Sequence, residues 1–221
     1  MLREIRITPS ILNADLSHLD QEIALIAADS DFLHLDVMDN IFVPNFTFDF
    51  ERASQIIKNS PIGVDAHLMV ADVDNIAPAY AQAGAMSVTI HVEATRDIVS
   101  TLKAIHAEGA RTGIAFKPAT QVSSYAKFLD DVDMFLIMSV EPGFGGQKFM
   151  HEMLDKIRQT RLIIGDRPIW LQVDGGISLD TIAQAAEAGA DTFVAGSAVF
   201  SSADPVEMIR SLRDCALSVT Q

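Results

Sequence analysis

The feature of this sequence that most limits its fold is a regular alternation between short β-rich runs and longer helical patterns, which occurs eight times. Alternation of this kind is typical of β–α–β units, in which consecutive strands run parallel and helices cover the sheet. The strand runs are nearly continuous in apolar residues, as in Phe135-Leu136-Ile137-Met138, which is expected when both faces of a parallel sheet are covered. The sequence therefore predicts an α/β protein built on a parallel sheet.

The eight predicted pairs follow one another without a linker. The strands are predicted at residues 5–12, 32–38, 62–69, 87–92, 112–117, 134–140, 169–174 and 192–195. The helices are predicted at residues 16–28, 50–58, 75–82, 96–107, 122–128, 150–163, 179–188 and 205–217. Polar residues recur at the C-terminal ends of six strands, which favours a closed ring over an open sheet with one switch point. We therefore predict one domain, residues 1–221, folded as a single (β/α)8 TIM barrel.

Composition excludes several other classes of protein. A hydrophobic fraction of 49% and a charged fraction of 21% indicate a folded chain with a large core. The net charge of −14 disfavours nucleic acid as a partner, although local backbone donors can still bind a small anion. No apolar run approaches the roughly 18 residues that a membrane helix needs. The start shows no signal-peptide pattern and Cys215 is the single cysteine, so we expect a cytoplasmic protein without membrane contact.

The second predicted strand carries polar residues at alternate positions. His34, Asp36 and Met38 share one face, because residues two apart in a strand point the same way. The other face is aliphatic and is expected to lie under the helices, so the polar face points into the barrel. A buried histidine and aspartate must find partners. This strand alone leaves two alternatives, a metal ion or a structural His–Asp hydrogen bond.

Two further strands add ligands of the same kind. Asp65, His67 and Met69 share a face of the third strand, and the seventh strand ends at Asp174. Imidazole nitrogens and carboxylate oxygens suit Zn²⁺, Mn²⁺ or Fe²⁺. A hydrogen-bonded polar plug is the alternative, although burying four ionisable groups in one core is costly. The predicted metal ligands are His34, Asp36, His67 and Asp174.

Asp36 and Asp174 are also candidates for proton transfer. A carboxylate on each side of a substrate can remove a proton from one face of a carbon and return one to the other face, which inverts that centre. The proton is acidic enough only beside a carbonyl group. A metal ion would stabilise the enediolate charge that develops when the proton leaves.

Three glycine-rich segments follow the sixth, seventh and eighth predicted strands. Glycine allows backbone N–H groups to approach a phosphate, and TIM barrels often bind phosphate beside their last strands. Three tight turns without a ligand are the alternative. The segments contain Gly143, Phe144, Gly145 and Gly146, then Gly175 and Gly176, and finally Gly196 and Ser197.

Three methionines, Met38, Met69 and Met138, end the second, third and sixth predicted strands. Methionine most often fills gaps in a core, because its side chain is flexible and polarisable. Their equal height in the barrel favours a second interpretation, a soft apolar lid over the reacting centre.

Taken together, these segments resemble the ribulose-phosphate 3-epimerase family, in order and over nearly the whole chain. The matching runs are Pro9-Ser10-Ile11-Leu12, His34-Leu35-Asp36-Val37-Met38-Asp39, Phe42-Val43-Pro44-Asn45, His67-Leu68-Met69, Met138-Ser139-Val140-Glu141-Pro142-Gly143-Phe144-Gly145-Gly146-Gln147, Val173-Asp174-Gly175-Gly176 and Gly196-Ser197-Ala198-Val199-Phe200.

The resemblance implies a reaction and residue roles. His34, Asp36, His67 and Asp174 would bind one divalent ion of zinc, iron, manganese or cobalt. Asp36 would accept and Asp174 donate a proton in one direction, with the roles exchanged in reverse. Ser10 and His67 would contact a phosphorylated ketopentose, and the three glycine segments would hold its phosphate. The implied reaction interconverts D-ribulose 5-phosphate and D-xylulose 5-phosphate at C3, in the pentose phosphate pathway.

Two positions depart from the family pattern. Asn40 stands where the family usually has glycine, and asparagine is the other residue that tolerates a left-handed backbone. Lys117 stands where the family commonly has asparagine, so a lysine at the mouth could contact substrate or extend outward. His91 and Glu93 on the fourth strand also resemble the family and are expected to support the metal ligands.

Alternatives to this interpretation remain open. The nearest is a D-allulose 6-phosphate 3-epimerase, which keeps the metal ligands and differs in the pocket. A metal-free lyase or decarboxylase would need a lysine among the carboxylates, for which Lys117 is the candidate. A non-catalytic sensor of sugar phosphates is a third. The oligomeric state is open, with a homo-oligomer among the alternatives. The remaining histidines, His18, His106 and His151, are expected to be exposed or to cap helices.

Overall fold

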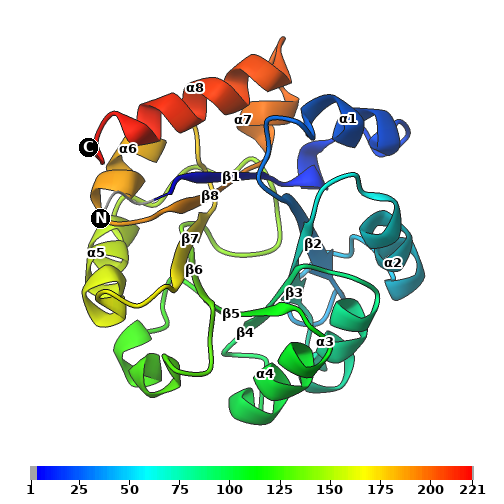
Figure 1. Ribbon diagram of the computed structural model, residues 1–221, viewed down its shortest axis with the longest axis vertical. Helices are drawn as coiled ribbons and strands as arrows, with labels where there is room; N and C mark the ends of the chain where they lie inside the picture. Colours follow the sequence, from blue (N-terminus) through cyan, green and yellow to red (C-terminus); the bar gives the residue numbers. More distant parts are fainter. Residues whose placement is uncertain (1–3, 221) are drawn as a thin grey trace.

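The computed structural model describes residues 4–220 and forms a (β/α)8 barrel. Eight parallel strands are hydrogen-bonded in the order β1-β8-β7-β6-β5-β4-β3-β2. A parallel bridge from Ser10 to His34 joins β1 to β2 and completes the ring. Figure 1 shows this ring in projection, with the helices on its outside. The predicted TIM barrel is therefore confirmed; of the predicted domain range, 1–3 and 221 lie outside the described residues.

The elements alternate as the sequence predicts. The strands are β1 (Arg6–Pro9), β2 (Leu33–Met38), β3 (Val64–Met69), β4 (Ser87–His91), β5 (Arg111–Phe116), β6 (Met134–Met138), β7 (Trp170–Asp174) and β8 (Thr192–Ala195). The α-helices are α1 (Leu19–Ile26), α2 (Phe50–Asn59), α3 (Val73–Gln82), α4 (Ile98–Ala107), α5 (Met153–Ile164), α6 (Ile182–Glu187), α7 (Ser197–Phe200) and α8 (Pro205–Leu217), and the 3₁₀ helices are η1 (Ile11–Asn13) and η2 (Val122–Phe128).

The structure corrects the sequence prediction in three places. The first strand ends at Pro9 rather than Leu12, because the Ser10 hydroxyl accepts a hydrogen bond from the amide of Leu12 and starts η1. The helix predicted at residues 122–128 is the 3₁₀ helix η2, not an α-helix. The short helix α7 was not predicted, and it begins inside the third glycine segment.

The two faces of β2 separate as the alternation predicts. Leu33, Leu35 and Val37 are buried in the large apolar core shared with the helices. His34 and Asp36 are equally buried but lie outside that core, on the inner face. The face of β2 that packs against the helices is therefore apolar, and the face that points into the barrel is polar. Within residues 4–220, no helix has both the length and the apolar character needed to cross a membrane.

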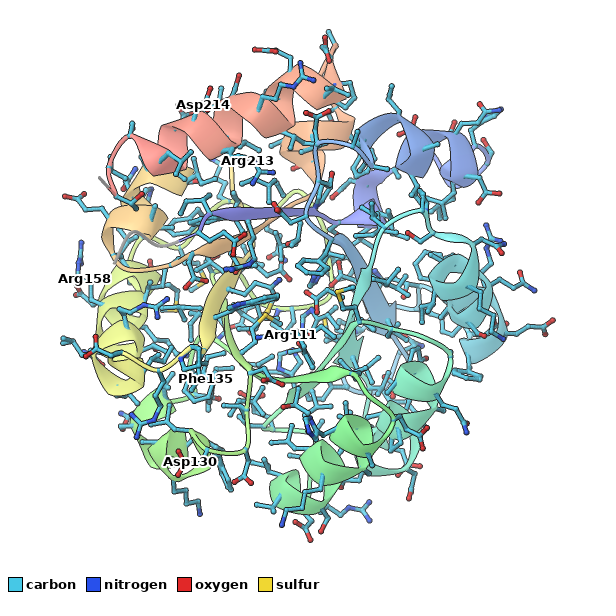
Figure 2. The ribbon with its side chains drawn as sticks, viewed as in Figure 1. Arg111, Asp130, Phe135, Arg158, Arg213 and Asp214 are labelled. Carbon is cyan, nitrogen blue, oxygen red and sulfur yellow. The ribbon has the colours of Figure 1, made fainter. Side chains whose placement is uncertain are left out.

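Side chains from opposite strands close the N-terminal end of the barrel. The guanidinium groups of Arg6 and Arg111 lie 4.2 and 3.7 Å from the ring centre of Trp170, a cation–π arrangement. These residues begin β1, β5 and β7. Figure 2 shows Arg111 near the middle of the ring, whereas Arg158 and Asp214 lie on the outer helices. In (β/α)8 barrels the active site lies at the other end, beside the C-terminal ends of the strands.

The loop after β2 is fixed by Asp39 and Asn40. Asn40 has a φ of 58°, so the prediction that asparagine allows a left-handed turn here is confirmed. One carboxylate oxygen of Asp39 accepts hydrogen bonds from the amides of Ile41 and Phe42, each at 2.8 Å. The other oxygen accepts from the amide of Ala71 at 2.7 Å. This carboxylate therefore ties the loop after β2 to the end of β3.

The turn after β7 requires glycine for steric reasons. Gly175 and Gly176 have φ values of 120° and 64°. A Cβ atom on Gly176 would lie 2.3 Å from the backbone nitrogen of Phe149, which belongs to the loop after β6. The absence of a side chain at this position therefore allows two site-forming loops to pack backbone to backbone.

We expect Gly176→Ala to lower the free energy of unfolding by more than about 1 kcal/mol, because both the backbone conformation and the space are wrong for a side chain. Gly109→Ala is the control, since Gly109 also has a positive φ, but among residues 4–220 only its own chain neighbours lie within 4 Å of the place a Cβ would take. Urea denaturation of both variants measures the difference. Equal losses would contradict the proposed loop contact.

Candidate active site

The register between β2 and β3 arranges histidines and carboxylates alternately at the mouth of the barrel. His34 pairs with Asp65 and Asp36 pairs with His67 across the two strands. Paired residues of neighbouring strands project from the same face of a sheet. Each imidazole therefore has a carboxylate beside it on the adjacent strand, and all four side chains lie inside the barrel.

Asp174, at the end of β7, completes a group of four candidate ligands. One atom from each of His34, Asp36, His67 and Asp174 lies within 4.8 Å of the others. His67 Nδ1 is 3.0 Å from Asp36 Oδ1 and 3.6 Å from Asp174 Oδ2. His34 Nε2 is 3.3 and 3.9 Å from oxygens of Asp36 and Asp174. The structure thus brings the four predicted ligands together, and the group could hold a metal ion.

The donor atoms of this group fit a cation. His34 Nε2 is buried and has no hydrogen-bond partner among residues 4–220. His34 Nδ1 lies 3.0 Å from Asp65 Oδ2, and that oxygen also accepts from Gln172 Nε2 at 2.8 Å. Because a carboxylate only accepts, a neutral His34 carries its proton on Nδ1, which leaves the lone pair of Nε2 to face the group. A histidine held by a carboxylate in this way is typical of metal ligands.

The electrostatics of the group also favour positive charge. Burial works to raise the pKa of Asp36, but the neighbouring His34 and His67 lower it far below its usual range. Burial works to lower the pKa of His34, but the charge of Asp36 and hydrogen bonds to Asp36 and Asp65 raise it well above its usual value. Both directions indicate an excess of carboxylate charge that a bound cation would balance.

The two aspartates of the group differ in acidity. Burial, followed by the nearby charge of Asp36, raises the pKa of Asp174 to about 6. Asp36 therefore carries its charge near neutral pH while Asp174 holds a proton into the mildly acidic range. A pair of carboxyl groups whose pKa values are driven apart is suited to act as a base and an acid.

A cavity opens directly above the two aspartates. It is lined by the three predicted methionines, Met38, Met69 and Met138, and by residues of all three glycine segments. His67 is fully buried below the cavity and is absent from its lining, although the sequence predicts that it contacts substrate. The predicted site residues that line the cavity are Ser10, Asp36, Met38, Met69, Met138, Gly143, Phe144, Gly145, Gly146, Asp174, Gly175, Gly176, Gly196 and Ser197.

Two further residues of the mouth have informative contacts. Ser10 donates a hydrogen bond from its hydroxyl to Asp36 Oδ2 at 2.6 Å, which links β1 to the carboxylate pair. Lys117 Nζ lies 3.8 Å from the ring centre of Phe42, and Lys117 does not line the cavity. The lysine that a metal-free lyase would need is therefore outside the group of carboxylates.

Asn13 is a site residue that the sequence analysis missed. It lines the cavity from η1, and its amide lies against two glycine segments. A Cβ atom on Gly145 or Gly196 would lie 2.6 or 2.7 Å from Asn13 Oδ1. Small residues in the two loops therefore leave room for the amide, which lies between the segments proposed to hold phosphate. The available signal was the run from Ser10 to Asn13, in which Ser10 caps η1 and Asn13 ends it.

Fold and site define an α/β-barrel enzyme with a candidate metal centre at the C-terminal ends of its strands. The profile of the Ribulose-phosphate 3 epimerase family matches residues 6–200. The chain is 48% identical to the ribulose-phosphate 3-epimerase of Mycobacterium leprae, over 97% of this chain and 96% of the relative. It is 46% identical to ribulose-phosphate 3-epimerase 1 of Cupriavidus necator, over 91% and 87%. The chain belongs to the ribulose-phosphate 3-epimerase family and is an isomerase, which confirms the resemblance.

Several solved structures share the fold at much lower identity. The 3-keto-L-gulonate-6-phosphate decarboxylase from Vibrio cholerae has a TM-score of 0.74 at 18% identity, covering 99% of this chain and 99% of that one. The 3-hexulose-6-phosphate synthase from Salmonella typhimurium has a TM-score of 0.72 at 19% identity, covering 97% and 100%. These similarities establish the barrel fold and nothing about the reaction.

The raised pKa of Asp174 predicts that this carboxyl destabilises the metal-free barrel near neutral pH. The folded chain keeps the proton up to about pH 6, whereas an unfolded chain releases it near 3.8. Its contribution to stability therefore falls as the pH rises between these values and stays low above them.

We expect Asp174→Asn to raise the free energy of unfolding of metal-free protein at about pH 8, with a gain that shrinks as the pH falls towards about 4. Urea denaturation across this pH range measures the effect. The exposed Asp180→Asn is the control for the same chemical change. A variant less stable than the parent at about pH 8 would contradict the assigned cause.

Proposed function

We propose that this isomerase is a metal-dependent ribulose-phosphate 3-epimerase that interconverts D-ribulose 5-phosphate and D-xylulose 5-phosphate at C3, in the pentose phosphate pathway. The names of its relatives support the substrate. One observation carries the mechanism: two aspartates of unlike acidity, Asp36 and Asp174, line one cavity. We also propose a cytoplasmic location, in keeping with a single cysteine, Cys215.

The proposed metal ligands are His34, Asp36, His67 and Asp174, whose donor atoms fit one divalent ion. Zinc, iron, manganese and cobalt all accept this mixture of nitrogen and oxygen donors. When bound, such an ion supplies positive charge beside the substrate oxygens on which negative charge develops. Side chains of the protein carry out the proton transfers.

In one direction, the Asp36 carboxylate accepts the proton from C3 of the ketose. The electron pair of the broken C–H bond moves into the C2–C3 bond, and the carbonyl π electrons move onto oxygen to give an enediolate. Asp174 then donates its proton to the opposite face of C3, which restores the carbonyl with inverted configuration. Ser10 donates a hydrogen bond to Asp36 and is suited to orient that carboxylate. The reverse reaction exchanges the two roles.

The phosphate end of the substrate is proposed to lie at the three glycine segments. These segments line the side of the cavity formed by the loops after β6, β7 and β8, where (β/α)8 barrels commonly bind phosphate. The methionines Met38, Met69 and Met138 are buried beside the aspartates and line the same cavity. We propose that they form an apolar cover, which limits access of water to the enediolate.

The alternative within this mechanism is a D-allulose 6-phosphate 3-epimerase, which would use the same ligands and carboxylates. The paired glycines at 145 and 146 and the Gly196-Ser197 segment favour the pentulose. Comparison of kcat/KM on both substrates distinguishes the two, and a larger value on the hexulose would favour the alternative. A metal-free lyase is disfavoured because Lys117 does not line the cavity. A homo-oligomer is one of the alternatives for the oligomeric state.

Solvent deuterium tests the proton steps. In D₂O, we expect the parent protein to place deuterium at C3 of the product, because the acquired proton comes from a carboxyl group. Asp174→Asn should lower kcat by about 100- to 10,000-fold while Asp36 still exchanges the C3 proton of one epimer alone. NMR spectra of the sugar phosphates report both events, with metal content measured in parallel. The proton-transfer proposal fails if product forms without deuterium, or if the loaded variant retains normal turnover.

Metal removal tests the centre itself. We expect a chelator to abolish turnover, and addition of Zn²⁺, Fe²⁺, Mn²⁺ or Co²⁺ to restore it. Because the ion binds the folded state alone, the melting temperature should rise with metal concentration. A double variant, His34→Ala with His67→Ala, should lose that response. Full turnover of protein shown by elemental analysis to hold no metal would contradict the proposal.

A further inference from the structure

A line of hydrogen-bonded groups extends from His67 away from the cavity. His67 Nε2 lies 3.0 Å from His91 Nε2, and His91 Nδ1 lies 3.1 Å from Glu93 Oε2. On its other side, His67 Nδ1 faces Asp36 Oδ1 at 3.0 Å. Both imidazoles are fully buried, and their rings stack with centroids 5.0 Å apart. Glu93, His91 and His67 therefore form a connected line that ends at the candidate metal centre.

At the outer end of this line, the contacts of Glu93 determine which group donates the hydrogen bond and which accepts it. Glu93 Oε1 accepts hydrogen bonds from the amide of Lys117, at 2.9 Å, and from the hydroxyl of Thr120. Burial works to raise the pKa of Glu93, but its hydrogen bonds with His91 and Thr120 lower it to about 2. Glu93 is therefore a carboxylate, which accepts hydrogen bonds and donates none. The proton between Glu93 and His91 must belong to His91 Nδ1.

The position of the proton on His91 in turn determines which nitrogen of His67 donates a hydrogen bond. His91 is fully buried, and a second proton on its ring would place another charge in the interior, which favours the neutral ring with one N–H group. That group is Nδ1, so His91 Nε2 has a lone pair. Two imidazole nitrogens 3.0 Å apart form a hydrogen bond only when one of them has a proton. His67 Nε2 must then be the donor. Asp36 Oδ1, 3.0 Å from His67 Nδ1, accepts a proton from that nitrogen when no cation is bound, and a cation that replaces this proton meets the lone pair of Nδ1.

We infer that Glu93 and His91 are positioning residues that fix the tautomer of His67, so that Nδ1 presents its lone pair to the metal-binding group. The inference rests on the metal centre of the proposed function. Phe42 packs on the other side of this line, with its ring centroid 4.9 Å from that of His91, and restricts the rotation of that imidazole. His34 receives the corresponding support from Asp65 directly, whereas His67 receives it through a second histidine.

Glu93→Gln should exchange donor and acceptor in each hydrogen bond of this line, with almost no change in the shape of the side chain. The amide oxygen of glutamine would take over the hydrogen bonds from Lys117 and Thr120, so its NH₂ group would face His91 Nδ1. His91 would then carry its proton on Nε2 and donate to His67 Nε2. His67 would be left with a proton on Nδ1, the nitrogen that faces the metal-binding group.

We therefore expect Glu93→Gln to weaken Zn²⁺ binding by about 10- to 100-fold, measured by competition with a chromogenic chelator. Glu108→Gln, at an exposed position after α4, is the control and should bind Zn²⁺ like the parent protein. Unchanged affinity in a folded Glu93→Gln variant would overturn the inference. A parent protein that binds no Zn²⁺ would instead overturn the proposed metal centre.

The tautomer of His91 provides a test that needs neither metal nor a variant. Imidazole ¹⁵N NMR spectra of metal-free parent protein should show His91 with a single proton, on Nδ1. In Glu93→Gln the proton should move to Nε2, a change that a purely structural role would not produce. A parent protein with the His91 proton on Nε2, or with protons on both nitrogens, would overturn the inference even if the variant does not fold.

Discussion

The parallel register between β2 and β3 is the constraint on which the site depends. It places Asp36 beside His67 and His34 beside Asp65, so each imidazole is next to a carboxylate across the strands. Because side chains alternate between faces, a slip of one residue would turn the inward side chains of one strand, such as Asp65 and His67, towards the helices and break both pairs. The aliphatic residues of the outer face oppose such a slip, since they would enter the polar interior. Core packing and site geometry are therefore enforced by the same hydrogen-bonded ladder.

The charges inside this ring explain why the site needs so much support. Asp36, Asp65 and Asp174 lie within one small region, and burial alone would raise the pKa of each. Histidines lower the pKa of the first two, whereas Asp174 lies against the charge of Asp36 and keeps a raised value. The difference in acidity between Asp36 and Asp174 thus arises from position alone, in two side chains of identical chemistry. A cation would relieve the repulsion that remains.

Much of the fold and the four candidate ligands could be predicted because they follow short-range patterns. Alternation with a period of two placed His34 and Asp36 on one face, and alternation of strands with helices indicated the barrel. The contacts of Asn13 could not be predicted, because Gly145 and Gly196 are more than 130 residues away in the chain. The donors and acceptors along the hydrogen bonds from Glu93 through His91 to His67 could not be predicted either. They depend on which ring nitrogens of two separate strands meet. Sequence patterns locate side chains on elements, whereas hydrogen-bond direction depends on tertiary distances.

The barrel by itself does not determine the reaction. The solved structures that share it at 18% and 19% identity include a 3-keto-L-gulonate-6-phosphate decarboxylase and a 3-hexulose-6-phosphate synthase. The same architecture therefore occurs in enzymes named for different reactions. The features that favour epimerisation here are local. Two carboxyl groups of unlike acidity line one cavity, two oriented imidazoles lie beneath them, and Lys117 is held over Phe42 outside the cavity. The proposed proton transfer between two faces of a carbon needs an acid and a base, and the closed ring brings Asp36 of β2 and Asp174 of β7 to the same cavity.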